Sequence, residues 1–186
     1  MNYKLVDNRI EFTDEKLTEN STNMISVIST YKFTKYMEQM PDGISILRSN
    51  ETRYTKLDVK NKYLQGVIYM PSKKDIFNHT RFGYLIFNRN ILFIDSSDTV
   101  INIIEQLRHS SIDMPTIWKF YYHFLNMLID RDLLYLQDIE NSLSTFENNL
   151  LDGGIDEYNQ RDIIYIRKKL FNQYRFYTQL FEIEHK

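Results

Sequence analysis

The stretch LLYLQDIENSLSTFENNLLDGG, residues 133–154, decides the fold that we predict from the sequence. Its apolar residues recur at alternating spacings of three and four, which is the pattern of one apolar face on an α-helix. These residues are Leu136, Ile139, Leu143, Phe146 and Leu150. The same spacing extends backwards through Trp118, Tyr121, Leu125 and Leu128, so the pattern predicts a single helix of about ten turns. Asp152-Gly153-Gly154 ends it, because glycine readily adopts the left-handed conformation that closes a helix.

A second amphipathic helix is predicted from about Asp156, antiparallel to the first. One of its apolar stripes consists of Ile163, Ile166, Leu170, Tyr174, Tyr177 and Phe181. A further stripe, roughly opposite, consists of Tyr158, Tyr165, Phe176, Leu180 and Ile183. One partner helix cannot cover both stripes, so the second flank needs the chain's own sheet, another subunit, or both. We assign this second stripe to a predicted oligomer interface.

The first part of the chain predicts a β-sheet with helices. Four β-like runs, YTKLDVK, YLQGVIYMP, FGYLIF and ILFIDS, are expected to pair, and YKLV with RIEF suggests a further hairpin. The segment Ser26–Met40 is ambiguous between strand and helix. A helix on the sheet is predicted from the spacing of Val100, Ile103, Ile104 and Leu107. The predicted class is therefore α/β: a mixed sheet flanked by helices over residues 1–112, followed by a long antiparallel two-helix arm over residues 113–186.

The composition excludes several classes of function. A formal net charge of −2 does not provide the positive field that binds nucleic acid. With no cysteine there is no disulfide framework, thiolate zinc site or cysteine nucleophile. The four histidines lack metal-ligand spacing, and no glycine-rich phosphate loop, HExxH or GxSxG motif occurs, so no enzyme is predicted. No run approaches the ~18 apolar residues of a membrane span.

The order of these segments resembles the cytosolic part of CorA-type magnesium transporters. In that family a strand hairpin and a helix precede a segment of the form LIDxxVDxYFxxLExIxxEIxxLE, a short turn, and a helix of the form LxxLRxxLxxLRxxxxPLxE. Here LIDRDLLYLQDIENSLSTFE and IIYIRKKLFNQYRFYTQLFE fall on those two patterns. The resemblance covers about residues 55–186 and rests on many weak positions. The family's Gly-Met-Asn signature and two membrane spans are absent from the chain, and the first fifty residues do not match clearly.

The resemblance implies a homopentamer at the cytoplasmic face of the cell membrane. Its cytosolic domains would sense Mg²⁺ and hold the pore closed when the ion is plentiful, with the membrane reached through spans beyond this segment. The transported ion is expected to be Mg²⁺, although relatives for cobalt, nickel or zinc share the architecture. The alternative from another class is a free-standing coiled-coil interaction protein, whose arm would dock a partner helix.

Two residues are candidate ligands of a regulatory Mg²⁺. Asn126 and Asp130 are four residues apart and are expected to lie on one face of the long helix. In the family pattern these positions resemble a paired-aspartate motif. Asp130 matches it, whereas Asn126 departs from it and would weaken cation binding. The alternative is a solvated polar face.

Asp132 is a different case, because it falls on the apolar stripe between Leu128 and Leu136. A buried carboxylate needs a partner. We expect a lysine or arginine of the second helix to pair with it, or the helix end to splay locally; the alternative is a regulatory crevice. The arm's predicted tip is acidic and could attract hydrated cations, although such a run more often serves solubility. It contains Glu140, Glu147, Asp152, Asp156 and Glu157.

Overall fold

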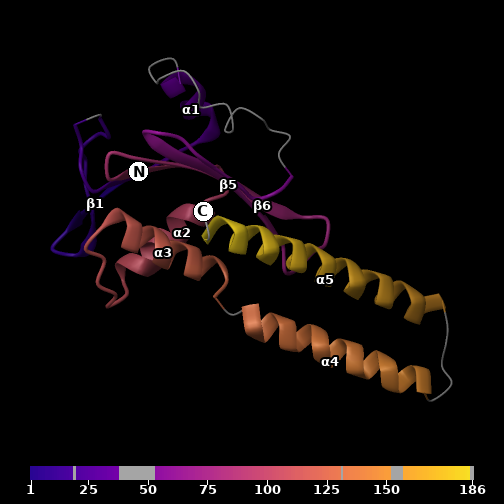
Figure 1. The fold of residues 1–186 in the computed structure, drawn as a ribbon. Helices are drawn as coiled ribbons and strands as arrows, with labels where there is room; N and C mark the ends of the chain where they lie inside the picture. Colours follow the sequence, from indigo (N-terminus) through magenta and orange to yellow (C-terminus); the bar gives the residue numbers. More distant parts are fainter. Residues whose placement is uncertain (19, 38–52, 131, 152–156, 185–186) are drawn as a thin grey trace.

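A computed structural model describes residues 1–18, 20–37, 53–130, 132–151 and 157–184. Its centre is a seven-stranded sheet in the order β2-β1-β3-β7-β6-β5-β4 (Figure 1). The strands are β1 (Asn2–Val6), β2 (Arg9–Phe12), β3 (Met24–Ile28), β4 (Lys56–Val59), β5 (Tyr63–Pro71), β6 (His79–Phe87) and β7 (Asn90–Ile94). Only the β3–β7 pair is parallel among these strands, and the others are antiparallel. The mixed sheet predicted from the sequence is thus confirmed.

Two tight reversals follow from the turn residues. Asp7 and Asn8, between β1 and β2, have φ of 48° and 65°. Asn88 and Arg89, between β6 and β7, have φ of 46° and 62°. Positive φ at both central positions gives the backbone twist that suits a two-residue hairpin. Both hairpins were predicted from the sequence and are confirmed.

Helices cover both faces of the sheet. On one face lie α2 (Thr99–Arg108), α3 (Ile117–Leu128) and the C-terminal half of α5 (Glu157–Glu184), while α1 (Thr30–Met37) lies on the other (Figure 1). The alternation along β7 serves both: Ile91 and Phe93 face the larger core, and Leu92 and Ile94 face the smaller one. The ambiguous segment is divided, because β3 ends at Ile28 and α1 begins at Thr30.

The predicted single long helix is wrong, because the chain turns between two helices. The first, α3, ends at Leu128, and α4 (Asp132–Leu151) begins after a short break. At that break the Ile129 N–H donates to the Asn126 carbonyl at 3.1 Å and the Asp132 N–H donates to the Ile129 carbonyl at 3.0 Å. The apolar spacing continues through the turn since α3 faces the sheet core and α4 faces α5. The spacing of apolar residues indicates which side of each helix is buried. It does not indicate where one helix ends and the next begins with a different axis.

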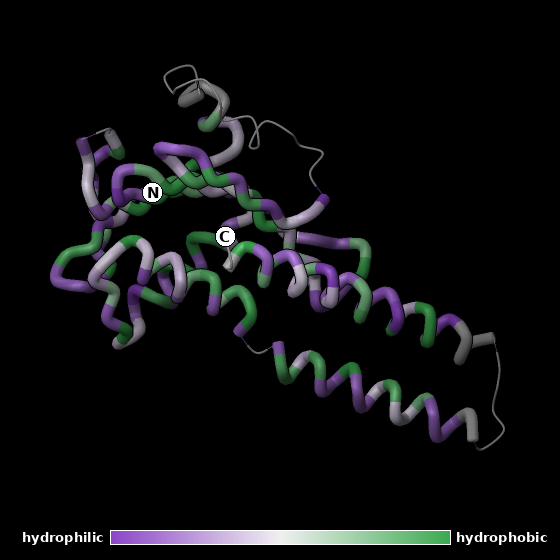
Figure 2. The backbone as a smooth tube through the Cα atoms, in the orientation of Figure 1, coloured by the Kyte–Doolittle hydropathy of each residue, from purple (hydrophilic) through white to green (hydrophobic). Residues whose placement is uncertain are grey.

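The antiparallel arm itself is present, formed by α4 and α5. It projects from the sheet, and the C-terminal half of α5 returns onto the sheet (Figure 1). Hydrophobic and hydrophilic residues alternate along both helices (Figure 2). None of the helices in the described part of the chain is long and apolar enough to span a membrane. The division between residues 112 and 113 stays a prediction.

Candidate functional site

Three segments meet at one buried carboxylate, at the joint between the sheet and the arm. Asp132 is the first residue of α4, and its side chain is 8% exposed. Its Oδ1 forms an ion pair with Lys73 Nζ, from the loop between β5 and β6. Its Oδ2 accepts a hydrogen bond of 2.6 Å from the Tyr177 hydroxyl of α5. We call these three residues the joint cluster.

Further contacts tie the loop of residues 72–78 to the helices. Lys73 Nζ donates to the backbone carbonyl of Asp130 at 3.4 Å, next to the turn that separates α3 from α4. The Tyr165 hydroxyl of α5 donates to the Lys74 carbonyl at 3.3 Å. About two helical turns further along, Asn172 Nδ2 donates to the Ile76 carbonyl at 3.4 Å. The loop therefore contacts α5 at two of its residues, Lys74 and Ile76.

Aromatic rings and a second lysine surround the cluster. Lys73 Nζ lies 6.0 Å from the centroid of the Tyr135 ring, and Lys169 Nζ lies 5.9 Å from the same centroid. Lys169 also lies 4.9 Å from the Tyr165 centroid. Such cation–π distances are at the outer limit of a useful attraction, except for the last one. Lys73 therefore pairs with the carboxylate, whereas Lys169 lies over two tyrosine rings.

Burial raises the pKa of two tyrosine phenols, Tyr177 in the joint cluster and Tyr135 beside it. Burial raises the pKa of Tyr177, and the hydrogen bond to Asp132 and the charge of that carboxylate raise it further. Burial also raises the pKa of Tyr135. Both phenols are therefore protonated at neutral pH, and Tyr177 is the donor to Asp132. A carboxylate engaged by one lysine and one phenol holds segments in place; it is not a vacant cation ligand.

The expected partner of Asp132 was partly wrong. The cation that pairs with it is Lys73 of the β5–β6 loop, and the second helix supplies a neutral donor, Tyr177, in place of a lysine or arginine. The alternative, a locally splayed helix end, stays a prediction; the structure shows instead that α3 ends at Leu128 and that α4 begins at Asp132. The sequence does not identify Lys73 as the partner of Asp132, because the two residues are 59 positions apart. The direction in which a loop lysine side chain points cannot be inferred from the sequence.

The geometry predicted for Asn126 and Asp130 is wrong. Asn126 is half-buried within α3, whereas Asp130 is exposed in the turn after that helix has ended at Leu128. The two residues therefore do not stack on one helical face. Among the described residues no group of three or more His, Cys, Asp or Glu is arranged to hold a metal ion. Their role as Mg²⁺ ligands stays a prediction.

The second stripe of α5 is largely buried inside this chain. Phe176, Leu180 and Ile183 are 2%, 4% and 7% exposed and belong to the core under the sheet. The sheet is therefore the surface that covers this part of the flank, so its burial does not require a second subunit. Tyr165 is half-buried beside the β5–β6 loop, and the side chain of Tyr158 lies outside the described residues. The interface role of the stripe stays a prediction.

The exposed flank of α5 differs from the predicted one. Tyr174 and Phe181, which the periodicity places against the partner helix, are 70% and 61% exposed, and Phe171 is 64% exposed. The reason is that α4 runs beside only the N-terminal half of α5, while the C-terminal half rests on the sheet. Of the predicted acidic tip, Glu140 and Glu147 are exposed on α4, and residues 152 and 156 lie outside the described part of the chain.

Comparisons with known proteins place the fold. No family model matches the amino-acid sequence. No curated protein matches it either. The structure is similar to the complete CorA magnesium transporter from Methanocaldococcus jannaschii, with a TM-score of 0.71, 18% identity, and coverage of 98% of this chain and 60% of that one. It is also similar to the full-length CmaX protein, with a TM-score of 0.65, 14% identity, and coverage of 98% and 61%.

A third similar structure is that of a cytoplasmic domain. It is the ZntB cytoplasmic domain from Vibrio parahaemolyticus RIMD 2210633, with a TM-score of 0.65, 14% identity, and coverage of 96% of this chain and 74% of that one. The chain spans about three fifths of the length of the full-length CorA and CmaX structures. Because identities are low, the likeness concerns the three-dimensional arrangement. This chain has the fold of the soluble domain of CorA-type transporters.

Proposed function

We propose that this chain is the cytosolic ion-sensing and gating domain of a CorA-like transporter for Mg²⁺ or another divalent metal ion. The observation that carries the proposal is the similarity over 98% of this chain, a share that takes in both the sheet and the arm. A likeness confined to the sheet would not favour a transporter, because mixed sheets host many unrelated functions. The similarity favours a transporter because it includes the arm as well as the sheet.

The joint cluster provides a mechanical basis for gating. Helix α5 is continuous from the arm to the sheet, so a displacement at the joint is transmitted along it. Helix α4 is separated from α3 by the turn at Ile129 and Asp130, where a change of axis needs only a few backbone dihedrals. An ion that binds one arrangement better than the other would shift the population toward it.

The donor chemistry near the joint is compatible with Mg²⁺. Asp130 supplies a carboxylate in the turn, and Asn126 supplies an amide oxygen from the preceding helix. Mg²⁺ prefers hard oxygen ligands and keeps several of its waters, so one or two protein ligands per subunit suffice. In the proposed homopentamer at the cytoplasmic face of the membrane, a neighbouring subunit could complete the coordination.

The proposal is tested by measuring the melting temperature and the sedimentation of the chain across a Mg²⁺ titration into the millimolar range. We expect Mg²⁺ to raise the melting temperature or the fraction of pentamer, because a ligand that binds only the native state stabilises it. Asp130→Asn is the informative variant, and Asp138→Asn on the exposed face of α4 is its control. Unchanged melting and sedimentation would remove the sensing role.

The transport role needs a separate test, which is to read the coding sequence beyond Lys186. Two apolar spans of ~20 residues, the first ending near Gly-Met-Asn, would support a transporter. A stop codon would favour the second candidate, a free-standing interaction protein. The exposed aromatic residues Phe171, Tyr174 and Phe181 favour some partner for α5 in either case.

A further inference from the structure

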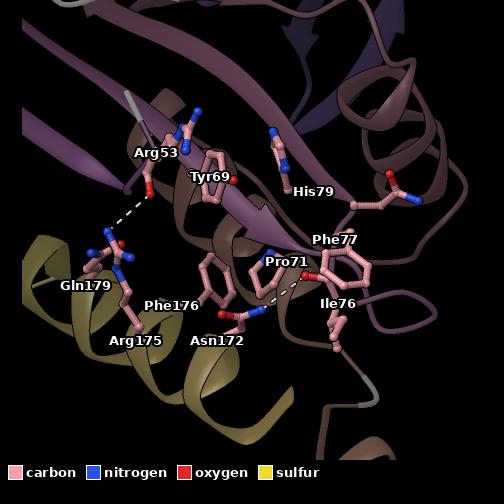
Figure 3. A pocket seen from close by; sticks show the side chains of 11 residues that line it. Arg53, Tyr69, Pro71, Ile76, Phe77, His79, Asn172, Arg175, Phe176 and Gln179 are labelled. Carbon is pink, nitrogen blue, oxygen red and sulfur yellow. Dashed lines mark hydrogen bonds between the residues drawn. The ribbon is translucent and has the colours of Figure 1, made fainter. Parts of the chain in front are cut away.

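A cavity of about 190 Å³ lies where α5 crosses the β5–β6 hairpin (Figure 3). Residues of β5, the following loop and β6 form one side, α5 forms the other, and Arg53 closes one end. We call it the hairpin pocket. The lining residues used below are Arg53, Tyr69, His79, Arg175, Phe176 and Gln179.

The charge of the hairpin pocket has one sign. Arg53 and Arg175 line it together with His79, and no aspartate or glutamate is among the lining residues. Neither arginine takes part in an ion pair with any residue that the structure describes. Surface arginines usually find a carboxylate or point to bulk water, and two that share a cavity without one leave a positive site.

The polar geometry around the pocket supplies donors. Arg175 Nη2 donates to the Arg53 carbonyl at 3.3 Å, which fixes the two residues relative to each other across the gap between α5 and the segment before β4. The Oε1 atom of Gln179 accepts from the Thr55 N–H at 2.9 Å, which is a second tie between α5 and the segment before β4. The two arginines line the pocket from different elements, Arg175 from α5 and Arg53 from that segment.

The nearby carboxylate of Asp75 is not among the lining residues and is engaged within its own loop. Its Oδ1 accepts from the Phe77 N–H at 3.0 Å, and its Oδ2 accepts from Asn78 Nδ2 at 2.7 Å. Phe77 and Asn78 both line the pocket, so these bonds hold the loop beside it.

Aromatic rings form the walls. The Tyr69 and His79 rings are stacked, with centroids 4.3 Å apart and an interplanar angle of 26°, and Figure 3 shows both beside the pocket. Phe176, 2% exposed, anchors the pocket to the core, and Phe77, 77% exposed, stands at its rim. A flat group attached to an anion would find an uncovered ring there.

We propose that the hairpin pocket binds a phosphate group, either free phosphate or the phosphate of a small monoester. Guanidinium groups match phosphate because their planar N–H pairs bind two oxygens at once. The volume is smaller than the roughly 300 to 1,000 Å³ of pockets for drug-sized ligands, which suits one phosphate group with a small attachment outside it. The proposal concerns a ligand other than a metal ion and does not depend on the proposed transport function.

Binding there would tie α5 to the sheet. The phosphate would be held by α5 through Arg175 and by the sheet side through Arg53, and the loop that borders the pocket also carries Lys73 of the joint cluster. A ligand that binds only when both sides are in place stabilises that arrangement. The pocket is therefore a second point, beside Asp132, at which the position of α5 is fixed.

The test is a titration of the 186-residue chain with inorganic phosphate and with phenyl phosphate, followed by calorimetry and ³¹P line broadening at constant ionic strength. Arg175→Gln and Arg53→Gln are the test variants. Arg167→Gln is the matched control, because Arg167 is an exposed arginine on the same helix, outside the pocket lining, and its loss changes the net charge equally. Circular dichroism checks that each variant is folded.

We expect each test variant to weaken phosphate binding at least about tenfold, since a charge-assisted pair is lost. The control should stay within about twofold of the unmodified chain, as expected for a distant screened charge. Tighter binding of phenyl phosphate would identify an ester as the ligand class, and equal binding would identify free phosphate; both support the site. Absence of binding for both probes, or equal losses in all three variants, would overturn it.

Discussion

Replacing Asp132 by asparagine tests whether the joint cluster holds the arm. The change preserves the size of the side chain and an oxygen that can accept from Tyr177, but it removes the charge that pairs with Lys73. Hydrogen bonds to charged groups contribute roughly 1.5 to 3 kcal/mol. Breaking a fully buried ion pair costs roughly 3 to 5 kcal/mol.

The cost here belongs at the lower end of those ranges. The Asp132 side chain is 8% exposed but that of Lys73 is 35% exposed, so the lysine can be rehydrated when its partner is lost. We therefore expect the variant to lose about 2 kcal/mol of unfolding free energy. For a chain of this size each kcal/mol lowers the melting temperature by about 2 to 4 °C, so the expected decrease is about 4 to 8 °C.

The assay is thermal and urea unfolding followed by circular dichroism, with Asp138→Asn as the control. Asp138 is an exposed carboxylate on the same helix, and its loss should change the unfolding free energy by less than about 0.5 kcal/mol. A double-mutant cycle with Lys73→Met should show a coupling of about 1 kcal/mol or more. If Asp132→Asn melts within about 1 °C of the control, or if the cycle gives no coupling, the carboxylate does not fix the joint.

Three further outcomes follow from the same structure. Burial raises the pKa of Tyr177 in the folded chain above the value of about 10 in the unfolded chain. The phenol's contribution to stability is therefore complete below about pH 10 and is lost as the pH rises through the folded-state pKa. In urea unfolding from about pH 9 to 12, Tyr177→Phe should flatten the alkaline loss of stability. Gly66→Ala should destabilise by about 1 to 3 kcal/mol or more in the same urea assay, because an added Cβ would lie 2.3 Å from the Tyr84 hydroxyl, 2.4 Å from Tyr84 Cζ and 2.7 Å from the Lys56 carbonyl oxygen. Phe176→Ala should cost about 3 to 5 kcal/mol and Phe171→Ala less than about 0.5 kcal/mol when both are compared by urea unfolding, and equal effects would contradict the burial of only one flank of α5.

Local patterns were sufficient to predict six of the seven strands, all but β3. The continuous apolar run of β7 indicates that both of its faces are covered, and the residues between β6 and β7 tolerate the positive φ that the hairpin needs. The strand order was not predictable, because the parallel pairing of β3 with β7 joins segments more than sixty positions apart and β3 begins an ambiguous stretch. Such pairings are decided by packing and not by local propensity.

The joint was predictable only in part. An aspartate on an apolar stripe signals a buried charge, and the structure places Asp132 at a helix end with two partners. Its two partners, Lys73 and Tyr177, could not be predicted. No sequence pattern distinguishes this loop lysine, or this one of fourteen tyrosines, from the others. The hairpin pocket was hidden for the same reason, since the hydrogen bond from Arg175 to Arg53 spans 122 positions.

The position of the joint along α5 determines how far a rotation there would displace the start of that helix. Tyr177 lies twenty positions from the start of α5 at Glu157, which corresponds to about 30 Å of helix. A rotation of about 10° at the joint would therefore move the tip by about 5 Å, on the scale of one helical turn. Two attachments act at nearly the same level of α5: Lys73 through Asp132 to Tyr177, and the hairpin pocket at Arg175, about 3 Å away along the helix axis. Tyr165 and Asn172 contact the loop of residues 72–78 nearer the tip. Weakening either of the two attachments alone should loosen the arm less than weakening both, because the remaining attachment still fixes one point of α5.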